Sequence, residues 1–438
     1  MKHWARPILI LLLIYTALHL IYSVVRYNVF DGNSSGDFNR AYQEALDWRR
    51  SLQTGQRMGV FHPPLYYGLL LCLDSVFRGM KNLAYFFYFI QFLLFPWAIW
   101  LLAKGGAADP RLVSRRSLIA ATLLCLNFQP FLETLAQHKV EGLEFVLICL
   151  AVVLYRRRRD LPAGALVMLA ANLKYLPAIL IGHFIWKREK KVLAGAALGG
   201  IAVLAVLTCW VGPIRVKEAV FQYPLELLFA HKYEGTVPEG SVEMQTLSGT
   251  VNRWFAQPLP GHTFEEYIRV GSYMPVPNPA FALRMAAALK GLLILGWLFV
   301  LRRRFPPQQR ESLWRVHLLE ISLSLVMIFV ISQAARVHYA ILLLPSFVYV
   351  ALLLAQEPQR FRRPEKCLFA GAYFLSAMVI PGGLLNSSRL PAHPIWGNQY
   401  SLAYLWYSLP FYGTLLLGAC IAVCLNRLYH VDEEDRGS

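Results

Sequence analysis

The sequence has few charged residues for its length. Only 16% of its 438 residues are charged and 56% are hydrophobic, whereas soluble domains usually carry about 25% charged residues. Apolar runs of roughly 20 residues, long enough to cross a ~30 Å hydrocarbon core, recur along the chain. It contains no internal repeat, no low-complexity tract and no compositional shift that would mark a soluble domain. The sequence therefore predicts an all-α polytopic membrane protein with one domain, residues 1–438.

Acidic residues are scarcer than basic ones, and the net charge is +17. The basic residues stand in short groups between apolar runs, at 156–159, 187–191, 302–304 and 360–366. A nucleic-acid-binding protein needs a continuous basic face, whereas short basic groups are typical of the cytoplasmic loops of membrane proteins. We therefore expect membrane lipids, and no nucleic acid, as partners.

Metal-binding patterns are also missing. The seven cysteines lie in or beside apolar segments and, apart from Cys420-x-x-x-Cys424, show no spacing typical of zinc or redox sites. We expect them to be small buried hydrophobic side chains. The sequence predicts neither a metal site nor a cofactor.

The basic groups predict how the apolar segments cross the membrane. The run 7–25 is longer than a signal-peptide core, and no small-x-small cleavage site follows it, so we interpret it as an uncleaved first helix. Ten crossings and one re-entrant pair keep every basic group and both termini cytoplasmic, in a plasma (inner) membrane. The expected crossings are residues 7–25, 82–103, 117–135, 143–155, 192–212, 278–301, 313–333, 338–356, 367–383 and 403–425.

Two apolar segments do not fit a simple crossing. Residues 64–77 are only 14 long and are predicted to form an external or interfacial helix within a first external loop, 26–81. Residues 161–186 have basic groups at both ends, so they should form two half-helices that turn back near Asn172–Lys174. Broken helices at membrane depth are tolerated where they line protein or a wet cavity. Residues 213–277 form a large external loop in this scheme.

The same orientation gathers unusual polar residues on the external face, and a cluster drawn from separate segments suggests a pocket. Each member also has a simpler explanation. Asp37 is equally well explained as a helix cap, Lys174 as part of the hairpin turn, and Glu144 as a solvated loop acid. The external set is Asp31, Asp37, Asp47, His62, Gln137, His138, Lys139, Glu141, Arg336 and His338, with Lys174 reaching toward it.

Six segments carry a resemblance to a known family. In order, they resemble motifs of glycosyltransferase family 87, the polyprenyl-phosphate-mannose-dependent mannosyltransferases among the GT-C glycosyltransferases. The segments are "GDFNRAYQEAL" (36–46), "FHPPLYYGLL" (61–70), "AQHKVEG" (136–142), "LKYLPAILI" (173–181), "MQTLSGTVNRWF" (244–255) and "RVHYAILLLP" (336–345).

The resemblance implies a GT-C fold of about 10–12 membrane helices, with the active site in its external loops. It implies metal-independent, inverting transfer of a hexose, mannose in that family, from a polyprenyl-phosphate donor to a lipid or glycan acceptor. Asp37, in the first external loop, stands at the position of the family's general base. A carboxylate there can accept the proton of the attacking hydroxyl. Lys174, Arg253 and His338 are expected to bind the donor phosphate. The residues expected in the acceptor pocket are His62, Gln137, Lys139, Glu141, Gln245 and Arg336.

Two other classes stay open on the sequence alone. A transporter or flippase for a lipid-linked sugar would use the same cavity without chemistry, but transporters commonly show internal repeats. An O-antigen-ligase-like transferase would have its long external loop near the C-terminus, whereas the longest loop here, 213–277, is central.

Overall fold

The computed structural model describes residues 36–54, 63–107, 114–136, 139–212, 245–263, 275–304, 309–310, 313–332, 337–377 and 407–437, together with the isolated positions 14, 17, 18, 21, 217 and 405. All regular structure within these ranges is helical, and no strand occurs in them. This confirms the all-α class that the composition predicts.

In the part of the chain that the structure describes, six helices are long and apolar enough to cross a membrane. Each overlaps a predicted crossing, so the protein is an integral polytopic membrane protein. The first predicted crossing, 7–25, falls almost entirely outside the described residues. The six helices are Met80–Gly105, Lys190–Trp210, Pro279–Val300, Trp314–Ile331, His338–Gln356 and Leu409–Tyr429.

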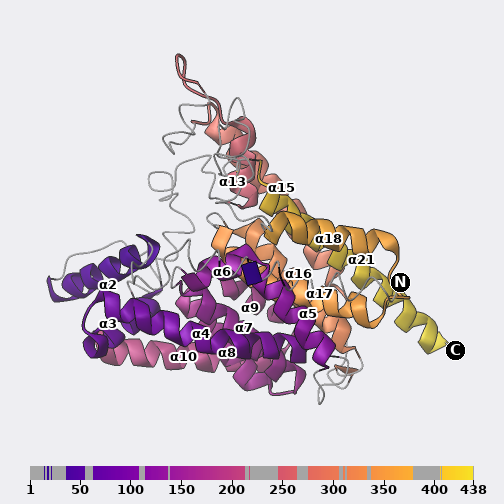
Figure 1. Ribbon diagram of the computed structural model, residues 1–438, viewed down its shortest axis with the longest axis horizontal. Coiled ribbons are helices and arrows are strands. Elements are labelled where there is room, and N and C mark those ends of the chain that lie inside the picture. The colour runs from indigo at the N-terminus through magenta and orange to yellow at the C-terminus, as the bar shows by residue number, and fades with distance from the viewer. Residues whose placement is uncertain are drawn as a thin grey trace. The chain divides into compact units, whose positions relative to one another are not determined.

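The chain divides into two compact units (Figure 1). Unit 1 comprises residues 1–126 and 131–232, and unit 2 comprises residues 127–130 and 233–438. The elements in the first part of the chain are α2 (Gly36–Thr54), α3 (Pro64–Phe77), α4 (Met80–Gly105), α5 (Arg115–Leu126), α6 (Gln129–Ala136), α7 (Glu141–Arg156), α8 (Asp160–Leu173), η1 (Leu176–Ala178), α9 (Ile179–Lys187) and α10 (Lys190–Val211). Those in the second part are α13 (Leu247–Phe255), α15 (Pro279–Val300), α16 (Trp314–Ile331), η5 (Val337–Leu343), α17 (Leu344–Gln356), α18 (Arg363–Ala377) and α21 (Leu409–Gly437). A single domain over the whole chain stays a prediction.

Helices α8 and α10 lie side by side (Figure 1). A Cβ atom on Gly195 of α10 would meet the backbone of Leu161 of α8, and one on Gly199, four residues later, would meet Ala165. The residue numbers on α8 and on α10 rise together along the contact, so the two helices are parallel. Their small residues let the two backbones approach closely. The segment between two parallel helices must return the chain to its starting end. Residues 174–187 therefore run back along α8, as the re-entrant pair predicts.

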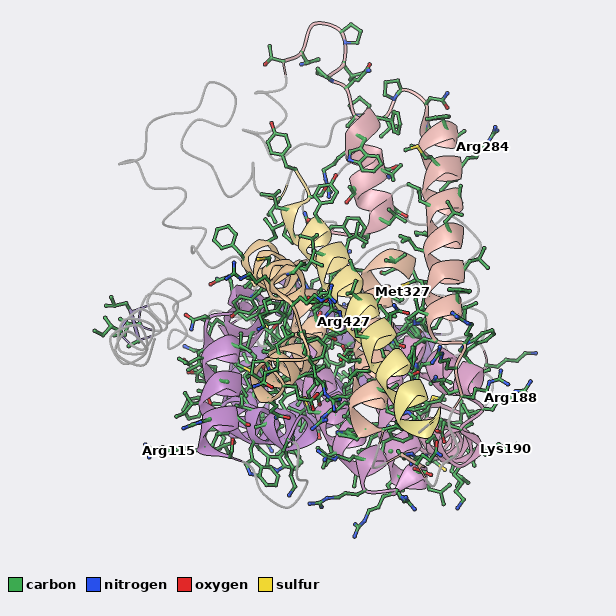
Figure 2. The ribbon with its side chains drawn as sticks, turned by 90° about the vertical axis from the view of Figure 1, so that its right-hand side faces the viewer. Arg115, Arg188, Lys190, Arg284, Met327 and Arg427 are labelled. Carbon is green, nitrogen blue, oxygen red and sulfur yellow. The ribbon has the colours of Figure 1, made fainter. Side chains whose placement is uncertain are left out.

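The two ends of the hairpin lie close together, as a chain that turns back requires. The hydroxyl of Tyr155, at the end of α7, donates a hydrogen bond to Glu189 at 2.8 Å, which brings the basic groups on either side of the hairpin together. Figure 2 shows Arg188 and Lys190 at the junction of α9 and α10. Helix α8 ends at Leu173, so the turn lies at the predicted position.

One predicted crossing is not a continuous helix. Residues 117–135 form parts of two helices, α5 and α6, that are separated at Asn127 and Phe128. Proline in a helix lacks the N–H donor and its ring clashes with the carbonyl four residues earlier. Pro130 thus ends the helix at Leu126, where α5 stops. By contrast, the helix predicted at 64–77 has the same bounds as α3.

Helix α2 packs its apolar face against the protein in unit 1. The ring of Phe38 meets Phe87 of α4 edge-on at 5.6 Å, and the ring of Trp48 lies 5.8 Å from Tyr67 of α3. The hydroxyl of Tyr42 donates to Asp74 at 2.7 Å. This packing fixes the first turn of α2, where the backbone of Asp37 lies next to Phe38.

In unit 2 the helices α16, α18 and α21 pack closely together. Figure 2 labels Met327 on α16 and Arg427 on the neighbouring α21. The hydroxyl of Tyr429 donates to the buried Glu320 at 2.6 Å, and Arg427 pairs with Glu365 of α18 at 2.5 Å. These contacts fasten the second half of α21 to α16 and α18.

Candidate functional site

The turn of the hairpin carries a buried ion pair. Lys174 follows the last residue of α8 in an extended backbone conformation, and its N–H donates to Ala170 at 3.1 Å. Its ammonium lies 2.5 Å from a carboxylate oxygen of Glu141, the first residue of α7. The two residues are 33 positions apart in the chain. The structure thus brings together one residue predicted to bind the donor and one predicted to line the acceptor pocket.

Tyr66 adds a phenol to this cluster. The side chain lies on α3, just after the two prolines that begin the helix, and is buried. Burial and the negative charge of Glu141 raise the pKa of the Tyr66 hydroxyl above its ordinary value. The phenol therefore stays protonated at neutral pH. The charged groups that act on it are Glu141, Lys174, Glu144 and Glu44.

A second carboxylate links α2 to α3 beside these groups. The Tyr67 hydroxyl donates to one oxygen of Glu44 at 3.0 Å, and the Arg40 guanidinium donates to the other at 3.0 Å. Because Glu44 lies about two turns after Asp37 on α2, these bonds hold the helix that carries the predicted general base.

Glu144 is not the solvated loop acid that the sequence suggests. Helix α7 begins at Glu141, so Glu144 lies in its first turn, and the residue is fully buried. Within the described residues, neither oxygen of its carboxyl group has a hydrogen-bond partner. The prediction failed because the apolar run begins after Glu144, whereas the helix begins before it.

The segment before α7 is tied to α4. The side-chain amide of Gln91 donates to the carbonyl of Lys139 at 2.7 Å, and the Lys139 N–H donates to Thr134 at 3.2 Å. A Cβ atom on Gly142 would come within 2.9 Å of the Gln91 side-chain oxygen, so a larger residue there would displace the Gln91 amide. Lys139 itself is buried, next to the cluster in the chain.

In unit 2 residues Leu247–Phe255 of the motif at 244–255 form helix α13, which positions a buried arginine. Arg253 donates to the Ser408 hydroxyl from two nitrogens, Nε at 3.2 Å and Nη2 at 2.7 Å. Its Nη2 also lies 3.5 Å from the hydroxyl of Thr250. Burial lowers the pKa of the guanidinium to about 10, so it stays charged at neutral pH.

Gln245 and His338 also lie in unit 2. The Gln245 amide donates to the carbonyl of Leu405 at 2.9 Å, so both it and Arg253 bind the stretch just before α21. His338 is buried at the start of η5, and its ring meets Tyr339 edge-on at 4.4 Å.

Four predicted site residues cannot be placed in this way. His62, Gln137 and Arg336 lie outside the described residues, and the side chain of Asp37 is not among those described. Among the described residues there is no group of three or more His, Cys, Asp or Glu that would hold a metal ion.

Sequence reasoning missed Tyr66, Ser408 and Thr250. Tyr66 was visible in the Pro-Pro-Leu-Tyr-Tyr stretch as a polar group on an otherwise apolar helix. Ser408 gave no local signal, because it lies 155 positions from Arg253.

A model of glycosyltransferase family 87 matches residues 61–332, which is more than half of the chain. The chain belongs to glycosyltransferase family 87. No curated protein and no solved structure matches it. This family 87 protein, all-α and with several helices able to cross a membrane, is therefore a membrane glycosyltransferase of the GT-C class.

Proposed function

We propose that this family 87 glycosyltransferase transfers a hexose, mannose, from a polyprenyl-phosphate donor to a lipid or glycan acceptor. Transfer takes place on the non-cytoplasmic face of the plasma (inner) membrane, with both termini cytoplasmic. The orientation rests on the basic groups between the apolar runs, which favour the cytoplasm. The family match supports the class of reaction, and the choice of donor and sugar rests on the motifs that resemble the family's.

The proposed step is a single displacement that inverts the anomeric carbon. An acceptor hydroxyl attacks that carbon, and a new carbon–oxygen bond forms on the face opposite the leaving phosphate. The bond between the anomeric carbon and the phosphate oxygen breaks, and polyprenyl phosphate leaves with the electron pair. Asp37 accepts the proton of the attacking hydroxyl. The phosphate is a good leaving group, and cations next to it stabilise the charge that develops.

The observation that carries this proposal is the ammonium at the turn of a re-entrant hairpin. Lys174 lies where a broken helix exposes polar backbone, which membrane proteins tolerate at sites that line protein or a wet cavity. Charged groups at such depth mark functional sites by default. Arg253 supplies a buried cation in unit 2, with a planar fork of donors that suits phosphate oxygens.

The proposal is tested by incubating the purified protein with radiolabelled polyprenyl-phosphate-mannose and crude membrane glycolipids. We expect label to move from the donor into a new glycolipid or glycan, with the opposite anomeric configuration. Donor carrying a different hexose serves as the control for sugar identity. If the protein transfers no label from any polyprenyl-phosphate hexose, the proposed donor class is wrong.

A further inference from the structure

The two partners of the ion pair at the hairpin turn differ in exposure. The Glu141 side chain has 2% of its surface exposed and that of Lys174 has 15%. A molecule that arrives from solvent therefore meets the side chain of Lys174 and not the carboxylate of Glu141. This asymmetry disfavours a direct contact between Glu141 and the acceptor. It favours a role in which the carboxylate acts through Lys174.

We propose that Glu141 is a positioning residue for the donor, whose carboxylate holds the Lys174 ammonium in place for the lipid phosphate. This inference rests on the proposed function, because it takes the phosphate of the donor as the ligand of Lys174. A lysine side chain is flexible, with a compact charge at the end of a four-carbon stem. Pairing with Glu141 orders that stem in one geometry, and such positioning of a charged group against the reacting phosphate lowers the barrier to transfer.

Both ends of the pair stand on fixed backbone. Lys174 donates its N–H to the last turn of α8. On the other side, the Gly142 N–H donates to the carbonyl of Lys139 at 3.2 Å, and Gln91 donates to the same carbonyl at 2.7 Å. The position of the ammonium is thus set by two helices. A site supported in this way holds its geometry better than one on a mobile loop.

Stability alone explains the pair poorly. Taking two charges out of water is costly, and replacing a buried ion pair with apolar residues is often neutral or stabilising. If the pair serves donor binding, its carboxylate affects how tightly the ammonium binds phosphate. The carboxylate and the incoming phosphate are both anions, so they compete for one ammonium that has three N–H donors.

This competition predicts an unusual combination of effects for Glu141→Gln. The amide keeps the size and the hydrogen-bonding oxygen but removes the negative charge. The affinity for a lipid phosphate should rise roughly tenfold, because a nearby like charge is gone. The rate constant kcat should fall, because the ammonium is no longer held by an ion pair. A residue that contacts the acceptor would instead raise the acceptor KM and leave phosphate affinity unchanged.

The test measures binding of a short-chain polyprenyl phosphate to the full-length protein in detergent by titration calorimetry. Four proteins are compared: wild type, Glu141→Gln, Lys174→Met and the double variant. Lys174→Met should weaken binding, and the gain from Glu141→Gln should disappear in the double variant, because it acts only through Lys174. The transfer assay then gives kcat and both KM values for the single variants.

Glu365→Gln is the matched control. Glu365 is also nearly fully buried, and it pairs with the more exposed Arg427 at 2.5 Å in unit 2. Removing its charge should lower thermal stability to a similar extent and leave the affinity for polyprenyl phosphate unchanged.

The possible outcomes separate the two proposals. If Lys174→Met weakens binding but Glu141→Gln changes neither affinity nor kcat, the positioning role is wrong and the proposed function stands. If Glu141→Gln raises only the acceptor KM, the carboxylate belongs to the acceptor pocket. If Lys174→Met leaves binding unchanged, the phosphate role of Lys174 in the proposed function fails as well.

Discussion

In unit 1 the ammonium of Lys174 lies 2.5 Å from the carboxylate of Glu141, whereas in unit 2 the guanidinium of Arg253 lies 2.7 Å from the hydroxyl of Ser408. The same contrast extends to neighbouring contacts. The phenols of Tyr42 and Tyr67 in unit 1 donate to carboxylates. In unit 2 the amide of Gln245 donates to a backbone carbonyl, and the indole of Trp254 donates to the hydroxyl of Tyr412.

This difference has consequences for chemistry and for stability. Hydrogen bonds to charged groups contribute about 1.5–3 kcal/mol each, compared with about 0.5–1.5 kcal/mol for neutral pairs. Loss of Lys174 therefore leaves the charge of Glu141 without this ion pair, whereas loss of Arg253 leaves the neutral hydroxyl of Ser408. Carboxylates can also take up protons, which neutral amides and hydroxyls cannot do. We therefore expect proton transfer in unit 1.

The largest expected effect follows from this expectation and concerns Asp37. The change Asp37→Asn removes the proton acceptor but keeps the shape of the side chain, and general-base assistance is worth about 10²–10⁴ in rate. Transfer should fall by that factor. The fold should survive, because α2 begins at Gly36 and an asparagine near a helix start is well tolerated. The transfer assay and a thermal melt measure the two quantities.

Asp47→Asn is the control for this prediction. Asp47 lies on the same helix and accepts a hydrogen bond from Arg50 at 3.2 Å in an exposed position, where an ion pair contributes little. Its substitution should change neither transfer nor melting temperature by much. Transfer at the wild-type rate by the Asp37→Asn variant would rule out the general-base assignment. Loss of transfer together with loss of folding would point to a structural role.

The next effect compares removal of two cations, the half-buried Lys174 and the buried Arg253. Lys174→Met leaves Glu141 as a buried charge without its partner, a change that typically costs about 3–5 kcal/mol. Arg253→Met leaves the hydroxyls of Ser408 and Thr250 without their guanidinium donor, and an unsatisfied buried group of this kind typically costs about 1–3 kcal/mol of stability. The free energy of unfolding in detergent should therefore fall further for Lys174→Met than for Arg253→Met.

A second substitution separates charge from packing in this comparison. Adding Glu141→Gln to Lys174→Met removes the unpaired charge and should restore much of the lost stability. Adding Ser408→Ala to Arg253→Met should restore little, because a serine hydroxyl is neutral. Equal losses for Lys174→Met and Arg253→Met, with no recovery in the double variant, would show that the ion pair behaves like the neutral contacts.

The sequence allowed accurate prediction where length and charge constrain the chain. Residues 64–77 are too short to cross a membrane and form α3 with the same bounds. The basic groups on both sides of 161–186 required the chain to return, and α8 ends at Leu173, next to the predicted turn. Both results depend on local composition and on the direction of the chain, which a sequence contains.

The predictions failed where a single residue or a distant contact decides the structure. Pro130 divides the expected crossing 117–135, although the hydrophobicity of that segment is continuous. Glu144 is buried because α7 begins before the apolar run does. The contact between Arg253 and Ser408 joins residues 155 positions apart. Tertiary packing sets these features, and no periodic pattern in the sequence reports them.

The smallest expected effect compares two tyrosines, one from each unit. The Tyr42 hydroxyl donates to Asp74 at 2.7 Å in unit 1, and the Tyr412 hydroxyl accepts from Trp254 at 3.1 Å in unit 2. At pH 8, Tyr42→Phe should lower the free energy of unfolding by about 1–2 kcal/mol, since the acceptor is a carboxylate. Tyr412→Phe should lower it by less, because its partner is neutral and exposed.

A pH series sharpens the comparison, because ionisation acts on the Tyr42 contact. Burial and the hydrogen bond to Asp74 raise the pKa of Tyr42 to about 12, from an ordinary value of 10.0. The unfolded chain therefore loses this proton first, so the stabilisation is complete below about pH 10 and is lost as the pH rises through about 12. The stability difference between wild type and Tyr42→Phe should narrow across this range in chemical unfolding experiments. A difference that stays constant up to pH 12 would mean that the bond to Asp74 does not hold α2 against α3.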